Sequence, residues 1–195
     1  MKALSLFVLL CATTTLACQQ STKGSATPKP DTGNFAQITY RNDFFGFSYT
    51  LPKEWHKSSV SPSPLPSGAY YLFIGDRDTG HALLNRLTIV ADPKNANRPG
   101  LSTQEYLSAF IRAEVRQAHA EVTREPSSFS SGGSDFYRAD YKWLNNGTTI
   151  YSSMVCSERN GYWIDWTFTT PSQQDLDAAL NTLQHVSFDN PSTRQ

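Results

Sequence analysis

The chain has 195 residues, with 17 basic and 17 acidic side chains, so its formal net charge at pH 7 is zero. This balance argues against a nucleic-acid-binding protein, which would need a basic face, and against electrostatic capture by anionic lipid. The length suits one folded domain with an ordinary hydrophobic core.

The N-terminus has the three-part pattern of an export signal, with Lys2, a short apolar run and then small residues before Cys18. Residues 3–17 are uncharged but fewer than the roughly 18 that a membrane-spanning helix needs, so we expect residues 1–17 to be a cleaved signal peptide. Thr15-Leu16-Ala17-Cys18 resembles the bacterial lipobox, with the leucine two places before the cysteine instead of the commoner three. We therefore predict that Cys18 carries acyl chains such as palmitate, with an ordinary secreted protein as the alternative.

The segment after Cys18 has the composition of a linker. Residues 19–34 contain no aromatic or large aliphatic side chain and cannot bury enough surface to offset their ordering entropy. We predict a lipidated flexible tether over residues 18–35, a folded domain over 36–189 and a disordered tail over 190–195. The tether would hold the domain at the cell membrane or outer membrane, in the periplasm or at the cell surface.

Alternating, aromatic-rich segments between turn residues predict β-strands in the folded domain. The last three segments are joined by turns containing Asn146-Gly147 and Asn160-Gly161, which favour tight hairpins, so these segments should form an antiparallel meander. In the final strand, one set of alternating side chains should lie on one face of the sheet and the intervening set on the other. The sets are Tyr162, Ile164, Trp166 and Phe168, and Trp163, Asp165, Thr167 and Thr169. The predicted strands are 37–41, 46–51, 69–75, 84–92, 134–144, 148–158 and 161–169.

Two segments have the period of a helix. Ser102 and Glu105 form a capping box before an amphipathic run that should end near His119. Near the C-terminus, Thr170 should cap a second helix with Pro171 in its first turn. Each helix has one apolar face and should pack on the sheet, which predicts an α+β fold: an antiparallel β-sheet flanked by α-helices.

Residues 40–55 resemble the start of PsbP-like and Mog1-like domains. The shared features are a short strand leading into Gly46-Phe47-Ser48-Tyr49, followed by Pro52 and Trp55. The order of a strand pair, a helix, a meander rich in Tyr and Trp and a C-terminal helix is similar as well. The resemblance implies α/β/α layers and a non-enzymatic binding or assembly module, and it assigns no functional residue.

The chain lacks the spacings expected of a catalytic or metal site. His56, His81, His119 and His185 are scattered, so no metal site is predicted, and Asp76–His81 lacks the ligands of a calcium loop. Residues 130–134 lack the Lys-Ser/Thr of a phosphate loop and are interpreted as a flexible connector. Cys156 is interpreted as a buried core residue. No catalytic residue and no cofactor is predicted.

Two groups of side chains are candidates for a binding surface. Pro62, Pro64 and Pro66 can form a polyproline strip on which a partner docks, or a loop over the sheet. The aromatic side chains of Trp143, Tyr151 and Trp163 can line an apolar groove, or belong to the core beneath a helix.

These observations favour a lipid-anchored envelope protein whose domain binds another envelope protein, as an accessory or assembly factor. The alternative is a carrier of a small apolar ligand, with a pocket between sheet and helix. An enzyme comes third, because it would require Cys156, Asp140 or Asp165 to lie in an open cleft with a perturbed pKa.

Overall fold

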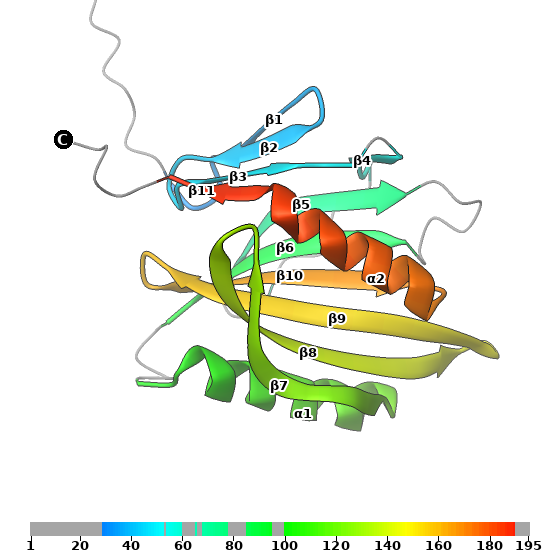
Figure 1. Ribbon diagram of the computed structural model, residues 1–195. Helices are drawn as coiled ribbons and strands as arrows, with labels where there is room; N and C mark the ends of the chain where they lie inside the picture. The colour runs from blue at the N-terminus through cyan, green and yellow to red at the C-terminus, as the bar shows by residue number, and fades with distance from the viewer. Residues whose placement is uncertain are drawn as a thin grey trace, which may run out of the picture.

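The computed structural model describes residues 29–52, 54–59, 65, 68–77, 85–94 and 100–189. The predicted signal peptide, Cys18, His81, the tail over 190–195, and Pro62, Pro64 and Pro66 lie outside the described residues. The described chain forms two antiparallel sheets and two α-helices (Figure 1). This confirms the predicted α+β class.

A seven-stranded antiparallel sheet forms the centre of the fold. Its strand order is β4-β5-β6-β10-β9-β8-β7, so the predicted meander has four strands rather than three. The strands are β4 (Trp55–Lys57), β5 (Tyr70–Arg77), β6 (Arg86–Pro93), β7 (Glu121–Ser131), β8 (Ser134–Asn145), β9 (Thr148–Arg159) and β10 (Tyr162–Thr170).

The prediction missed β7, the edge strand of this sheet. Its register with β8 shifts between Val122 and Arg124 and again between Arg124 and Ser127, and it contains Pro126. Bulges and a proline are tolerated at a sheet edge, and they remove the regular alternation that identifies a strand in a sequence. The interpretation of residues 130–134 as a flexible connector is wrong, because residues 130 and 131 end β7, residues 132 and 133 form a hairpin turn, and residue 134 begins β8.

A smaller sheet of order β1-β2-β3-β11 packs on the large one. Its strands are β1 (Asn34–Ala36), β2 (Thr39–Asn42), β3 (Phe47–Thr50) and β11 (Val186–Phe188). The folded region begins before the predicted boundary at residue 36, since the rings of Phe35 and Phe73 lie 5.3 Å apart. The Asn42 side-chain amide also donates a hydrogen bond to the carbonyl oxygen of Pro30 (2.9 Å).

Helix α1 (Thr103–Ala118) has the predicted capping box. The Ser102 hydroxyl accepts a hydrogen bond from the Glu105 backbone N–H, and the Glu105 carboxylate accepts one from the Ser102 N–H. The helix ends at His119, in the left-handed conformation common at helix C-termini.

Helix α2 (Gln173–Asn181) begins later than predicted. Its N-cap is Ser172, whose hydroxyl accepts a hydrogen bond from the Asp175 N–H, while Thr170 is the last residue of β10. Proline before the cap, rather than in the first turn, separates strand from helix. A short 3₁₀ segment, η1 (Thr182–His185), follows. Within the described ranges, neither helix has the length and apolar character needed to cross a membrane.

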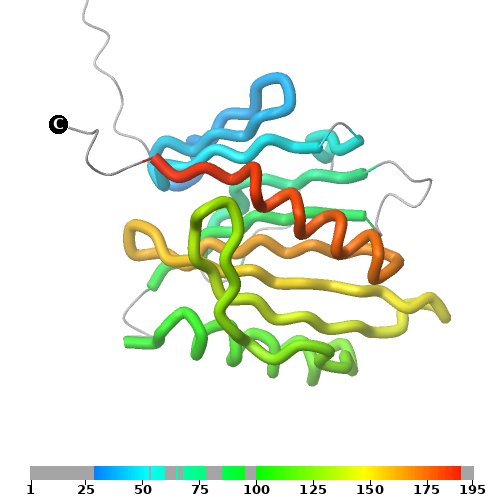
Figure 2. Tube along the Cα trace, in the orientation of Figure 1, coloured from blue at the N-terminus to red at the C-terminus, as the bar shows by residue number. Residues whose placement is uncertain are grey.

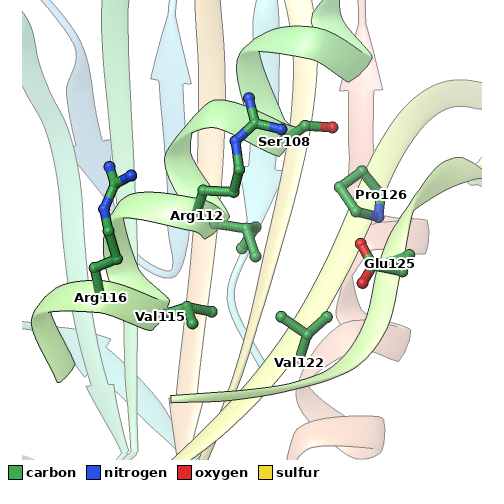
Figure 3. Close-up of a pocket in the computed structure, with 8 residues that line it drawn as sticks. Ser108, Arg112, Val115, Arg116, Val122, Glu125 and Pro126 are labelled. Atoms are coloured by element: carbon green, nitrogen blue, oxygen red, sulfur yellow. The ribbon is translucent and has the colours of Figure 1, made fainter. Parts of the chain in front are cut away.

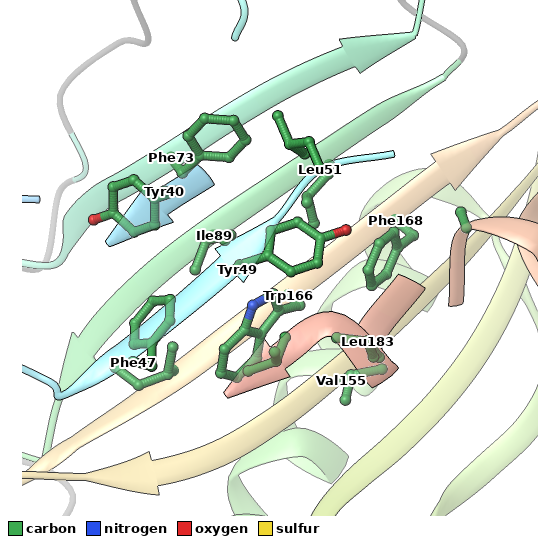
Figure 4. Packing of buried hydrophobic residues seen from close by; sticks show 14 of the residues in the cluster. Tyr40, Phe47, Tyr49, Leu51, Phe73, Ile89, Val155, Trp166, Phe168 and Leu183 are labelled. Atoms are coloured by element: carbon green, nitrogen blue, oxygen red, sulfur yellow. The ribbon is translucent and has the colours of Figure 1, made fainter. Parts of the chain in front are cut away.

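The large sheet is the middle of three layers. Helix α2 and the small sheet cover one face, and α1 covers the other (Figures 1 and 2). Phe47, Tyr49, Trp166, Phe168 and Leu183 meet in the core on the α2 side (Figure 4). Burying each large apolar side chain contributes about 1.5–3 kcal/mol, so this core is the main source of stability.

The face under α1 has a smaller core of its own. Tyr106, Leu107 and Ile111 of α1 pack against Met154 and Trp163 of the sheet. The Tyr106 and Trp163 rings are stacked, with centroids 4.1 Å apart and planes 8° apart. The predicted alternation of β10 is therefore confirmed, because Trp163 lies under α1 while Ile164 and Trp166 face the other core.

Candidate functional site

The three aromatic residues proposed as a groove do not form one surface. Trp163 is fully buried under α1, which agrees with the alternative that it belongs to the core beneath a helix. Trp143 is half-buried at the edge of the same core, with its ring stacked on Tyr141 at 5.6 Å. Tyr151 packs against the core on the opposite face, because the register pairs it with Lys142 while Trp143 pairs with Ile150. The Asn146-Gly147 turn fixes this register, so the sequence contained the signal. A binding role for Trp143 or Tyr151 remains a prediction.

The residues considered for catalysis are held in structural contacts. Cys156 is completely buried, and burial raises the pKa of its thiol well above its ordinary value, which disfavours the nucleophilic thiolate. Asp140 accepts two hydrogen bonds from the Arg138 guanidinium, at 2.8 and 2.7 Å. His56, His119 and His185 are exposed, and the described part of the chain contains no cluster of three or more metal-ligating side chains.

Asp165 is different, because it lines a pocket between α1 and the large sheet. The pocket has a volume of about 410 Å³ and is bounded by β5, β6, β8, β9 and β10 on one side and α1 on the other. Val90, Phe110 and Met154 supply apolar wall, and Asp92, Asp165 and Glu114 supply three carboxyl groups.

One tyrosine links two of these carboxyl groups. The Tyr106 hydroxyl lies 2.7 Å from Oδ2 of Asp165 and 3.1 Å from Oδ2 of Asp92, so the two carboxyl groups share its single donor hydrogen. Asp165 is 4% exposed, and its Oδ1 accepts no hydrogen bond of normal geometry from any described residue. A buried carboxylate oxygen without a donor is costly, so Asp165 is held in an environment that does not suit its charge.

The protonation of Asp165 reflects that environment. The pKa of Asp165 is raised to about 7, chiefly by burial and to a smaller extent by the negative charge of Asp92, with hydrogen bonds from Cys156 and Tyr106 acting in the opposite direction. Near neutral pH both forms of the carboxyl group are therefore populated. Burial also raises the pKa of Glu114, on the same pocket. The pocket can accept hydrogen bonds and positive charge, and it presents no activated nucleophile.

Sequence reasoning identified Asp165 as a carboxyl group to test, but it missed Asp92, Tyr106 and Glu114. Tyr106 and Phe110 have the spacing of the apolar stripe of an amphipathic helix, and nothing in that spacing distinguishes a pocket wall from a packed core. The signal for Asp165 was its place next to Trp163 on one face of β10, where a charge beside a large aromatic side chain is unexpected.

A second hollow of about 490 Å³ lies between α1 and the edge strand β7. Ile111, Val115 and Val122 form its apolar part. Figure 3 shows Arg112 and Arg116 side by side along α1, with Glu125 and Pro126 across the groove on β7. The exposed guanidinium groups give this groove the opposite charge to the first pocket.

No protein-family model and no curated protein matches this chain in sequence. Cyanobacterial PsbP (CyanoP) from Synechocystis sp. PCC 6803 is similar in structure, with a TM-score of 0.53 and 13% identity, covering 80% of this chain and 96% of that one. A protein from Bacteroides thetaiotaomicron has a TM-score of 0.47 at 15% identity, covering 77% and 47%. LpqN, involved in cell envelope biogenesis of Mycobacterium tuberculosis, has a TM-score of 0.44 at 13% identity, covering 84% and 90%. The last two superpose too weakly to carry an argument. The first shows that the chain has a PsbP-like fold, as its sequence predicted, and a fold alone assigns no activity.

Proposed function

We propose that this PsbP-like domain is a lipid-anchored, non-enzymatic binding protein of the cell envelope whose ligand is a small organic molecule. The observation that carries the proposal is the pocket of about 410 Å³ between α1 and the large sheet. Its volume falls within the range of about 300–1,000 Å³ that is usual for ligand sites. From the sequence we favoured a protein partner, with a small apolar ligand as the alternative. The pocket beneath α1 favours the small ligand instead.

The lining supports binding better than catalysis. Ligand sites are mostly apolar with a few polar groups that orient the ligand, which describes Val90, Phe110 and Met154 around Asp165. Among the described residues, the thiol near this carboxyl group is that of Cys156, which is buried with a raised pKa and so is poorly suited to nucleophilic attack.

The anchor is proposed from the sequence around Cys18. Mass spectrometry of the mature protein from cells tests it directly. We expect an N-terminus at Cys18 carrying acyl chains, and a Cys18→Ala chain that is found in the fraction without membranes. An unmodified N-terminus at another residue would instead support an ordinary secreted protein.

Native mass spectrometry of the purified protein tests the pocket. Thr88 lies on β6 and lines the pocket, so Thr88→Phe fills the space, whereas Thr88→Val keeps the volume nearly unchanged. We expect a small molecule bound to the wild-type and Thr88→Val proteins and absent from Thr88→Phe. A protein that carries nothing from cells and binds no member of a fragment collection would overturn the proposal.

The groove between α1 and β7 favours a second candidate function, an accessory protein that binds an envelope partner. Its support is an open apolar floor flanked by exposed Arg112 and Arg116. In-cell crosslinking and affinity capture, with Cys18→Ala as the control for anchoring, test this candidate. We expect one envelope protein to be recovered with the wild type and lost in an Arg112→Glu, Arg116→Glu double variant. Recovery that is unaffected by the double variant would exclude this groove.

A further inference from the structure

We infer that the pocket beneath α1 selects an organic cation, a protonated primary or secondary amine attached to an apolar body. This inference rests on the proposed function, since it names the chemical class of the molecule that the pocket holds.

The first step is the charge of the pocket. Its described lining includes the carboxyl groups of Asp92, Asp165 and Glu114 and no lysine, arginine or histidine. Lys94 lies over the Trp163 ring at 5.3 Å, but its ammonium group is bound to Glu158 at 2.6 Å and does not line the pocket. An anionic ligand would meet like charge here, and a cation would meet opposite charge at short range.

The second step is the hydrogen bond that Asp165 lacks. Its Oδ2 accepts from the Tyr106 hydroxyl and the Cys156 thiol is a weak donor to the carboxyl group, while its Oδ1, in a residue that is 4% exposed, has no N–H or O–H donor among the described residues. A ligand N–H supplies that donor, and a charged N–H also compensates the buried carboxylate. A quaternary ammonium supplies charge without a donor, so primary and secondary amines fit the site better.

The third step is the rest of the cavity. Val90, Phe110 and Met154 bound it with aliphatic, aromatic and thioether groups, and the phenol rings of Tyr71 and Tyr141 complete the wall. A small amine without a hydrocarbon portion would not contact this apolar wall. The volume and lining therefore indicate an amine with a hydrocarbon or aryl portion of several carbon atoms.

Protonation makes a further distinction. Asp165 is faced by Asp92 from β6, Tyr106 from α1 and Cys156 from β9, with Glu114 of α1 and Tyr141 of β8 on the same pocket. Burial raises the pKa of Asp165 to about 7, so below neutrality this carboxyl group must lose a proton before it can balance a cation. Affinity for an amine should fall as the pH falls from 8 to 6, by at most about tenfold per unit.

Calorimetric titration of the purified protein with three probes that share a phenethyl group tests the inference. The probes are phenethylamine, phenethyl alcohol and 3-phenylpropionate, which are cationic, neutral and anionic at pH 8. We expect the amine to bind at least about tenfold more tightly than the alcohol, as a charge-assisted hydrogen bond implies, and the carboxylate to bind most weakly. Asp165→Asn should weaken amine binding about tenfold and leave the alcohol within about twofold, whereas the exposed Asp177→Asn on α2 should change neither.

The two proposals fail in different ways. If the alcohol or the carboxylate binds as tightly as the amine, and Thr88→Phe abolishes that binding, the pocket binds ligands and the cation inference is wrong. If the amine binds but Asp165→Asn and Glu114→Gln both leave its affinity unchanged, the inference is likewise wrong. If none of the probes and no other fragment binds in a way that Thr88→Phe abolishes, the proposed function fails as well.

Discussion

The two faces of the large sheet are built from the same strands but differ in chemistry. On β10, the side chains that point toward α2, Ile164, Trp166 and Phe168, are all apolar and fully buried. The side chains that point toward α1 include Trp163, Asp165 and Thr167, with a buried carboxyl group among them. Successive side chains of β10 therefore alternate between a closely packed core on the α2 side and a pocket on the α1 side.

The difference indicates which face specifies the fold and which face is available for function. Apolar burial stabilises in proportion to area, and the α2 side has most of it, from both sheets and α2. A carboxyl group placed in the other core destabilises the protein, and such departures from consistent packing are expected at functional sites. Four changes test this contrast, from the largest expected effect to the smallest.

Trp166→Ala should destabilise the protein most, because it removes the centre of the core on the α2 side. The Trp166 ring contacts Phe47 at 5.8 Å, Phe136 at 5.5 Å and Phe188 at 6.4 Å between centroids. Deleting a buried tryptophan costs about 3–5 kcal/mol of unfolding free energy, measured by urea denaturation. Trp143→Ala, at a half-buried position, is the matched comparison and should cost clearly less. Equal losses for the two variants would contradict the assignment of the main core.

Asp165→Asn should change how stability depends on pH. Between about pH 4 and pH 7 the folded protein keeps a proton on Asp165 that the unfolded chain releases, because the pKa in the fold is about 7 against an ordinary 3.8. Wild-type stability therefore falls as the pH rises through this window, by at most about 1.4 kcal/mol per unit from this group, and levels off above it.

The asparagine variant lacks this contribution. Its unfolding free energy relative to wild type should rise between pH 5 and pH 8 in urea denaturation. Asp177→Asn, at an exposed position on the other side of the molecule, controls for the loss of one carboxyl group. Parallel pH profiles for wild type and Asp165→Asn would show that the carboxyl group is not held in a desolvated pocket.

The apolar face was largely predictable from the sequence, and the pocket face was not. The alternation of Ile164, Trp166 and Phe168 and the Asn-Gly turns specify strands, faces and register through local rules. By contrast, β7 escaped prediction because bulges and Pro126 interrupt its pattern, and β1, β4 and β11 escaped it because each is only three residues long.

The pocket could not be derived because it depends on contacts between distant segments. Tyr106 and Asp165 lie 59 residues apart in the chain, and only the packing of α1 on the sheet brings them within 2.7 Å. A tyrosine on the apolar stripe of a helix has the same spacing whether it fills a core or binds a carboxyl group. Asp165 was identifiable as unusual in its strand, but its partners were not.

Gly132→Ala should destabilise the β7–β8 hairpin, whose turn packs against η1. The β7–β8 turn approaches η1, and a Cβ at residue 132 would lie 3.0 Å from the carbonyl oxygen of Gln184. Residues 132 and 133 both have positive φ, but a Cβ at Gly133 meets open space. Alanine at a positive φ costs about 1–2 kcal/mol, so Gly133→Ala should lose about that amount and Gly132→Ala more, in thermal or urea unfolding. Equal losses would show that the hairpin tip does not contact η1.

Ser102→Ala and Ser172→Ala remove equivalent N-caps from the helices on the two faces. Each should cost about 1 kcal/mol, because each deletes a side-chain acceptor for a backbone N–H, Glu105 for α1 and Asp175 for α2. Their effects on function should differ, since α1 forms one wall of the pocket and α2 does not. Amide hydrogen exchange should show faster opening of α1 only in Ser102→Ala, and binding of phenethylamine should weaken only in that variant. Weakening of equal size in both would mean that ligand affinity follows global stability. The assignment of ligand binding to the α1 face and of fold stability to the α2 face would then be wrong.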